Sequence, residues 1–156
     1  MGYILVRSLL LHRLGNNEVK CGVLTVAEIF DAKWMQSMMD EWNKEPELAN
    51  DLLNLGFNST IAYGFDHEDE PRGILVIENG QAILGTVFDS HQYNWDLRAA
   101  KCDWKEWFKK PPSMMALGMA YTSRKLKFVK GDYTSMIKDP RMAGPFIKSF
   151  TVMGRV

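Results

Sequence analysis

Residues 72 to 88 read RGILVIENGQAILGTVF, and this stretch decides the fold. Asn79-Gly80 is a strong signal for a two-residue hairpin turn, because a type I′ turn needs positive φ at both central positions. The runs on either side, 72 to 78 and 81 to 88, are rich in strand-forming apolar residues. We therefore predict a β-hairpin in which Glu78 pairs with Gln81.

This register determines which side chains share a face of the hairpin. Val76 lies opposite Ile83 on one face, and Leu75 lies opposite Leu84 on the other. A hairpin with one face in water would alternate apolar and polar residues. Both faces are apolar here, so we expect the hairpin to be covered on both sides or to face a cavity.

Three further segments suit β-strands, namely residues 59 to 66, 93 to 101 and 126 to 130. The middle one places Trp95, Leu97 and Ala99 on one side. Asp96 and Arg98 fall on the other side. This alternation predicts a strand with one exposed face.

Two helices are predicted before the sheet. Thr25 and Glu28 form a capping box. Apolar residues then recur at helical spacing as Val26, Ile29, Phe30, Trp34, Met38 and Trp42. A second, shorter helix is expected to begin at Pro46 and to end before Gly56.

The segment after residue 101 combines a second capping box with an aromatic cluster. Asp103 and Glu106 form the box. Trp104, Trp107 and Phe108 stand at i, i+3 and i+4. One helical turn therefore presents three large aromatic side chains together.

Further helices are predicted in the C-terminal part. Residues 113 to 123 carry methionines and other apolar residues around nearly the whole circumference of a helix, so we expect this helix to be buried on most sides. Asp132 should cap a brief helix that Pro140 ends. Residues 142 to 153 carry an apolar stripe that ends at Gly154.

Composition and charge limit the possible functions. The 156 residues are 46% hydrophobic and 24% charged, which is typical of one folded domain. Lys and Arg number 19, as do Asp and Glu, so no net charge attracts nucleic acid. We expect residues 25 to 156 to form a single domain, with residues 1 to 24 as an N-terminal extension.

The two cysteines, Cys21 and Cys102, lie far apart and show no metal-binding pattern. We therefore expect neither a disulfide framework nor a zinc site, and we predict a reducing, cytoplasmic location. The apolar run near the N-terminus is split by Arg7 and is followed by no cleavage signal, so export is not expected.

No local signature of a cofactor-dependent enzyme occurs, so we expect no cofactor. The run Asp66-His67-Glu68-Asp69-Glu70 holds the groups of a metal or acid–base site, but it does not match the ligand order of an EF-hand. A solvated loop is the favoured interpretation.

Asp89-Ser90-His91 places a hydroxyl beside an imidazole. Adjacent residues in a strand point to opposite faces and cannot form a catalytic relay, so a turn is favoured over a nucleophile. An enzyme would need His67 or His91 beside a pocket with a carboxylate partner.

Basic residues gather around the last predicted strand, at Arg124, Lys125, Lys127, Lys130, Lys138 and Arg141. Lysines commonly protect an edge strand from pairing with another chain. A second interpretation is that they steer the domain to anionic lipid headgroups, which leaves a transient membrane contact open.

The sequence holds ten methionines. Methionine is flexible and polarizable, so it suits surfaces that adapt to different apolar shapes, although a plastic core explains the same pattern.

Several short motifs follow one another in a defined order: residues 74 to 80, Trp95-Asp96-Leu97, Cys102-Asp103-Trp104, Pro112 to Met119, Arg124-Lys125-Leu126-Lys127 and Gly131-Asp132. Together they resemble the sterol carrier protein 2 family, from about Val26 to the C-terminus. That family commonly has a Gly before the basic strand, where this chain has Ser123-Arg124. Residues 128 to 130 add one residue, which a β-bulge would accommodate.

The resemblance implies an α+β fold with a five-stranded, mostly antiparallel sheet covered by helices. It also implies a hydrophobic tunnel for fatty acids, acyl-CoA or sterol-like lipids, bound without catalysis, and a C-terminal helix that acts as a lid. We predict the binding of an apolar small molecule or lipid. The expected lining residues are Trp104, Trp107, Phe108, Met115, Met119, Met136, Phe146 and Phe150.

The same bulky side chains could instead fill the interior. The alternative hypothesis is therefore an accessory subunit or protein-interaction module with the same fold and a filled cavity. A protein partner or a homo-oligomer would then be expected.

Overall fold

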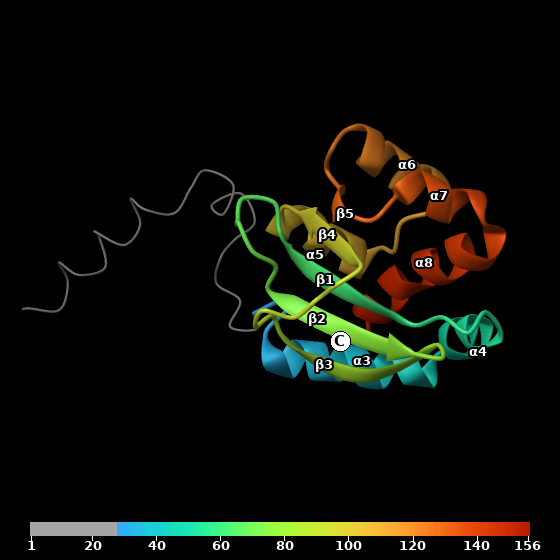
Figure 1. Ribbon diagram of the computed structural model, residues 1–156. Coiled ribbons are helices and arrows are strands. Elements are labelled where there is room, and N and C mark those ends of the chain that lie inside the picture. Colours follow the sequence, from blue (N-terminus) through green and yellow to red (C-terminus); the bar gives the residue numbers. More distant parts are fainter. Residues whose placement is uncertain (1–27) are drawn as a thin grey trace, which may run out of the picture.

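The computed structural model describes residues 28 to 156 (Figure 1). The predicted N-terminal extension and the Thr25 cap lie outside the described residues. Five strands form one mixed sheet in the order β3-β2-β1-β4-β5, and β1 pairs with β4 in parallel. The other neighbouring strands are antiparallel. Their bounds are β1 (Ser59–Phe65), β2 (Gly73–Glu78), β3 (Gln81–Val87), β4 (Trp95–Ala99) and β5 (Lys127–Lys130).

Six helices in the described part of the chain accompany the sheet. They are α3 (Ala32–Lys44), α4 (Pro46–Asn54), α5 (Lys101–Lys109), α6 (Met114–Thr122), α7 (Tyr133–Lys138) and α8 (Pro140–Met153). Helix α3 packs against β2 and β3, whereas α8 contacts α4, α5 and α7 (Figure 1). The α+β fold class, the five predicted strands and their mostly antiparallel pairing are thereby confirmed.

The hairpin turn is formed as predicted, but the strand pairing shifts by one residue beyond the Ile77–Ala82 pair. Asn79 and Gly80 have φ values of 47° and 81°, and Glu78 pairs with Gln81. A β-bulge then leaves Ile83 without a direct partner, so that Val76 faces Leu84 and Leu75 faces Gly85. The predicted pairs Val76–Ile83 and Leu75–Leu84 are therefore wrong.

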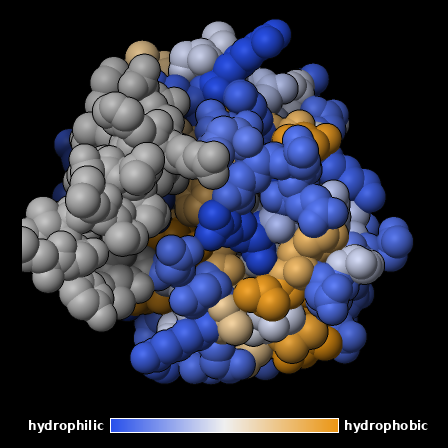
Figure 2. Space-filling view, turned by 90° about the vertical axis from the view of Figure 1, so that its left-hand side faces the viewer, coloured by the Kyte–Doolittle hydropathy of each residue, from blue (hydrophilic) through white to orange (hydrophobic). Residues whose placement is uncertain are grey.

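One face of the hairpin is covered by α3. A Cβ atom at Gly85 would lie 2.2 Å from the Met35 carbonyl oxygen, so this glycine lets the helix approach the strand. The prediction that both faces are covered holds for β2 but is wrong for the edge strand β3, where Ile83 is 50% exposed and Leu84 40%. Figure 2 shows a mostly hydrophilic face of the molecule, with several separate hydrophobic areas.

Helix α3 begins later than predicted. Phe30 has a φ of 69°, which a helix excludes, and the Asp31 carboxylate accepts a hydrogen bond of 2.8 Å from the Trp34 amide. Helix α5 begins earlier than predicted, at Lys101, and its N-cap Ala100 offers no side-chain bond. Asp103 therefore lies inside the first turn, and the predicted capping box is wrong there.

The predictions for β4, β5 and α6 have different outcomes. Strand β4 is not half exposed, because Asp96 and Arg98 are buried as an ion pair. The bulge predicted in β5 is confirmed: Leu97 pairs with Phe128 and Asp96 with Lys130, which leaves Val129 exposed. Helix α6 is largely exposed, in contrast to its predicted burial.

Cys102 is disulfide-bonded. The cysteines therefore do not support the reducing compartment that was inferred from them. Among the helices described, none has the length and the apolar character needed to cross a membrane.

Candidate apolar binding site

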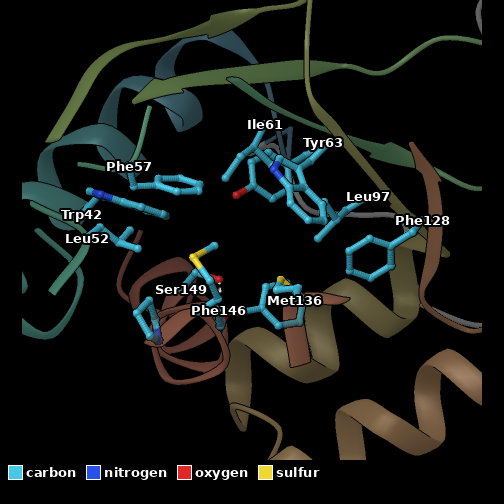
Figure 3. A pocket seen from close by; sticks show the side chains of 13 residues that line it. Trp42, Leu52, Phe57, Ile61, Tyr63, Leu97, Phe128, Met136, Phe146 and Ser149 are labelled. Atoms are coloured by element: carbon cyan, nitrogen blue, oxygen red, sulfur yellow. Dashed lines mark hydrogen bonds between the residues drawn. The ribbon is translucent and has the colours of Figure 1, made fainter. Parts of the chain in front are cut away.

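A small cavity of about 40 Å³ lies between the inner face of the sheet and helices α7 and α8 (Figure 3). Side chains from both layers and from the α3–α4 end of the molecule surround it. The residues that line it are Trp42, Leu52, Phe57, Ile61, Tyr63, Trp95, Leu97, Phe128, Met136, Met142, Pro145, Phe146 and Ser149.

The sheet wall of the cavity follows from the pairing of β1 with β4. Ile61 lies beside Trp95, and Tyr63 lies beside Leu97. Alternate strand residues point to the same face, so all four side chains face the helices. Phe128 of β5 extends this wall, and its ring packs edge-on against Trp95 with centroids 6.1 Å apart.

The opposite wall is one stripe of helix α8. Met142, Pro145, Phe146 and Ser149 stand at i, i+3, i+4 and i+7, the spacing of a single helix face. Met136 of α7 lies beside them (Figure 3). At one end Trp42 is fixed by a hydrogen bond of 3.0 Å from its indole nitrogen to the Gly80 carbonyl oxygen.

The cavity is almost entirely apolar. Over the described part of the chain, its lining includes no charged side chain and two hydroxyl groups, those of Tyr63 and Ser149. The Ser149 hydroxyl donates a hydrogen bond to the carbonyl oxygen of Phe146. A phenol is protonated at neutral pH, and burial raises the pKa of Tyr63 further above its ordinary value.

The structure places six of the eight predicted lining residues at the cavity or in the aromatic cluster beside it. Met136 and Phe146 line the cavity. Trp104 and Phe150 are fully buried and stack with centroids 6.1 Å apart, so they fill the interior beside the cavity. Trp107 and Phe108 pack around Trp104, at centroid distances of 5.4 Å and 6.1 Å.

Met115 and Met119 lie on the surface rather than at the cavity. They are 77% and 66% exposed. Helix α6 buries Leu117 and Ala120 and turns its methionines outward. A helix that is apolar all round carries no sequence signal for its buried side, which explains the misplaced prediction.

The sequence analysis did not assign most of the cavity residues to a binding site. The alternation of Ile61 with Tyr63 and of Trp95 with Leu97 was a usable signal. Assembling the cavity wall also requires that β1 and β4 be neighbours, and local patterns do not contain that pairing.

The histidines considered for catalysis lie away from the cavity. His67 stands 3.8 Å from Asp66 and stacks on Phe65, and the Asp89 amide donates to the His91 ring in a turn. Arg72 holds Glu68 in a hydrogen bond of 2.8 Å that lowers the pKa of this carboxyl. Over residues 28 to 156, no three side chains of the metal-binding types come together.

The mixed sheet and helices α7 and α8 thus enclose an apolar cavity. No protein-family model and no curated protein matches the chain. Among solved structures, a sterol carrier protein 2 superposes with a TM-score of 0.63 at 15% sequence identity, over 83% of this chain and 99% of the other. The chain therefore has the sterol carrier protein 2 fold.

Two further solved structures share this fold. A conserved hypothetical protein from Thermus thermophilus, described as possibly a sterol carrier protein, matches with a TM-score of 0.53 and 16% identity, over 82% of this chain and 86% of the other. A UbiJ-SCP2 ubiquinone synthesis protein matches with a TM-score of 0.50 and 11% identity, over 78% of this chain and 88% of the other. Such low identities define the fold alone.

Proposed function

We propose that this protein binds and carries an apolar small molecule or lipid, without catalysis, in the cavity between the sheet and α8. The observation that carries the proposal is the apolar, charge-free lining of the cavity. Burial of apolar ligand surface there contributes about 25 cal/mol per Å², so few polar contacts are needed. The fold shared with a sterol carrier protein 2 supports this function.

The cavity must widen to admit such a ligand. Its volume of about 40 Å³ holds only a few water-sized groups. A drug-sized ligand occupies a pocket of roughly 300 to 1,000 Å³. We therefore propose that the lining side chains rearrange and that part of α8 moves outward on binding.

Residues 140 to 146 of α8 are the segment best suited to move. Pro145 has no backbone N–H and cannot bond the carbonyl four residues earlier, which weakens the helix at this point. Met142, Pro145 and Phe146 all lie before or next to this interruption and line the cavity. The C-terminal half is fixed by Phe150 and Val152, which are fully buried.

Ligand binding is tested by narrowing the cavity. Met142→Trp places an indole into the space, and overpacking of this kind should weaken binding of the uncharged methyl decanoate by roughly tenfold or more. Met115→Trp, on the exposed face of α6, is the matched control and should bind like the wild type. Calorimetric titration measures both, and native mass spectrometry of gently purified protein shows any retained lipid. Absence of retained lipid together with absence of heat on titration would contradict the proposal.

The small cavity also supports the second candidate, an interaction module whose interior is filled by side chains. On that hypothesis, Phe146 and Met136 are permanent core residues rather than a ligand wall. A stoichiometric protein partner in pull-downs, combined with no lipid binding by Met142→Trp or by the wild type, would favour it.

We also propose that α6 and β5 form a surface that contacts anionic membranes. From residue 107 to residue 131 the chain has no Asp or Glu, and its cations are Lys109, Lys110, Arg124, Lys125, Lys127 and Lys130. Two of them are partly neutralised, because Lys125 lies 4.0 Å from Asp103 and Lys127 3.7 Å from Asp66. Exposed methionines beside basic residues suit the headgroup region of a bilayer.

This surface adjoins the cavity. Phe128 lines both the cavity and a surface groove that also contains Tyr121, Arg124 and Val129. A membrane bound at α6 and β5 would therefore lie next to one wall of the proposed binding site. A cytoplasmic location stays a prediction from the sequence.

A further inference from the structure

Tyr63 holds a fixed position in the floor of the cavity. It lies on the inner face of β1 and is 2% exposed. Its ring stacks on Phe30 with centroids 5.6 Å apart and meets Trp104 edge-on at 6.3 Å. These contacts leave the ring little freedom to turn its hydroxyl elsewhere.

The Tyr63 hydroxyl has no hydrogen-bond partner among residues 28 to 156, although the ring that carries it is buried. Every fully enclosed polar side-chain atom in this range is paired, so the unpaired Tyr63 oxygen must border open space. In Figure 3 this oxygen points into the space that the labelled side chains surround. Hydroxyl groups in apolar surroundings are almost always paired, since leaving one unpaired is unfavourable. A phenylalanine would make the same ring contacts without this penalty, so packing alone does not account for the hydroxyl.

The chemistry of the cavity restricts the missing partner. A phenol is protonated at neutral pH, so Tyr63 can donate a hydrogen bond into the cavity that it lines. None of the described residues that line the space is a cation, so an ionised carboxylate would be buried there without a counter-charge. The Ser149 hydroxyl already donates to the Phe146 carbonyl oxygen. A neutral oxygen acceptor satisfies Tyr63 at the least cost.

We infer that the ligand is an apolar molecule with a neutral carbonyl oxygen, such as a ketone, a quinone or an ester, and that Tyr63 donates a hydrogen bond to this oxygen. This inference rests on the proposed function, because it concerns the same cavity. The apolar walls then hold the hydrocarbon part, and Tyr63 sets the position of the carbonyl group.

Two probes of the same shape test the inference. One is methyl heptyl ketone, and the other is the alkene in which a methylene group replaces its carbonyl oxygen. Binding is followed by tryptophan fluorescence, since Trp42 and Trp95 line the cavity. The wild type should bind the ketone roughly two- to tenfold more tightly than the alkene. Tyr63→Phe should bind both equally and should keep the wild-type affinity for the alkene.

Stability gives a second, independent measurement. Tyr63→Phe removes an unpaired hydroxyl from apolar surroundings, so its ligand-free form should melt at the same temperature as the wild type or higher. Tyr93→Phe changes a tyrosine outside the cavity and should leave both the melting temperature and the ketone preference unchanged.

The outcomes separate this inference from the proposed function. If wild type and Tyr63→Phe prefer the ketone to the same degree, or if neither discriminates, the role of Tyr63 is wrong while apolar binding stands. A resident water on Tyr63 would give this result. A lower melting temperature of Tyr63→Phe would reveal a structural partner and would also overturn the inference. If neither probe binds the folded wild type, the proposed function fails, and the inference fails with it.

Discussion

Asp96 and Arg98 form a buried ion pair on the face of β4 that points away from the cavity. Their residues are 0% and 3% exposed, and a hydrogen bond of 2.9 Å joins Arg98 Nη2 to Asp96 Oδ2. Arg98 Nη1 also donates to the Glu68 carbonyl oxygen at 2.9 Å. The pair therefore connects β4 to the acidic loop after β1.

Removal of one partner leaves a buried charge without compensation. Arg98→Met should lower the free energy of unfolding by about 3 to 5 kcal/mol, measured by urea denaturation. Adding Asp96→Asn should recover part of this loss, because no charge is then buried alone. Arg141→Met breaks an exposed pair with Asp139 and should have little effect. Equal losses for Arg98→Met and Arg141→Met would contradict this account.

Single residues show what local patterns could and could not predict about the site. Met136 and Phe146 were predicted and line the cavity, whereas Met115 and Met119 were predicted and lie on the surface. Hydrophobicity indicates that a side chain is apolar. It does not indicate whether the facing element is another helix, a cavity or solvent.

At the scale of elements, turn and cap chemistry predicted most boundaries, and pairing between distant strands was the main gap. The Asn79-Gly80 hairpin and the Asp132 cap formed because their signals are local. The parallel pairing of β1 with β4 brings together segments more than thirty residues apart, as in Ile61 with Trp95. Helix α3 also satisfies backbone groups at the free edge of strand β3. The Asn43 side-chain amide donates a hydrogen bond of 2.8 Å to the Ala82 carbonyl oxygen, and its oxygen accepts one of 2.9 Å from the Ala82 amide.

The C-terminal end of α8 is tied to the junction of α3 and α4 by charge. Arg155 Nη1 lies 2.8 Å from Glu45 Oε2, and Lys148 Nζ lies 2.7 Å from Glu47 Oε2. Burial alone would raise the pKa of the Glu45 carboxyl. The hydrogen bonds from Arg155 and from the Glu47 amide, with the charge of Lys148, instead hold this pKa below its ordinary value of 4.5.

This lowered pKa predicts a pH-dependent contribution to stability. A carboxyl with a lowered folded-state pKa stabilises the protein above its ordinary pKa, and the contribution is lost as the pH falls through the folded-state value. Arg155→Ala should therefore reduce the free energy of unfolding at neutral pH by about 0.2 to 1 kcal/mol, because Arg155 is partly exposed. The difference from the wild type should shrink as the pH falls below 4.5, in denaturation curves at low salt. A difference that is constant over the whole pH range would contradict the role of Glu45.

At the scale of the whole molecule, a net charge of zero conceals an uneven distribution. The acidic residues lie outside the segment 107 to 131, which carries six Lys or Arg and the exposed methionines of α6. Overall composition therefore says nothing about a local electrostatic contact. The relevant quantity is the local charge beside exposed apolar side chains.

The α6–β5 surface predicts selective binding to anionic membranes. The wild type should bind vesicles of phosphatidylcholine mixed with phosphatidylserine but not vesicles of phosphatidylcholine alone, because each basic side chain near an anionic surface contributes about 1 kcal/mol. Added salt should weaken this binding.

Met115→Ser with Met119→Ser should lower the affinity roughly tenfold or more, since two apolar side chains no longer enter the interface. Leu53→Ser with Ile83→Ser is the matched control, because these residues are each 50% exposed but lie on α4 and β3. Vesicle co-sedimentation measures each protein with both kinds of vesicle. An equal loss in the control pair, or equal binding to neutral vesicles, would show that α6 does not form a membrane surface and would direct the search to an acidic protein partner.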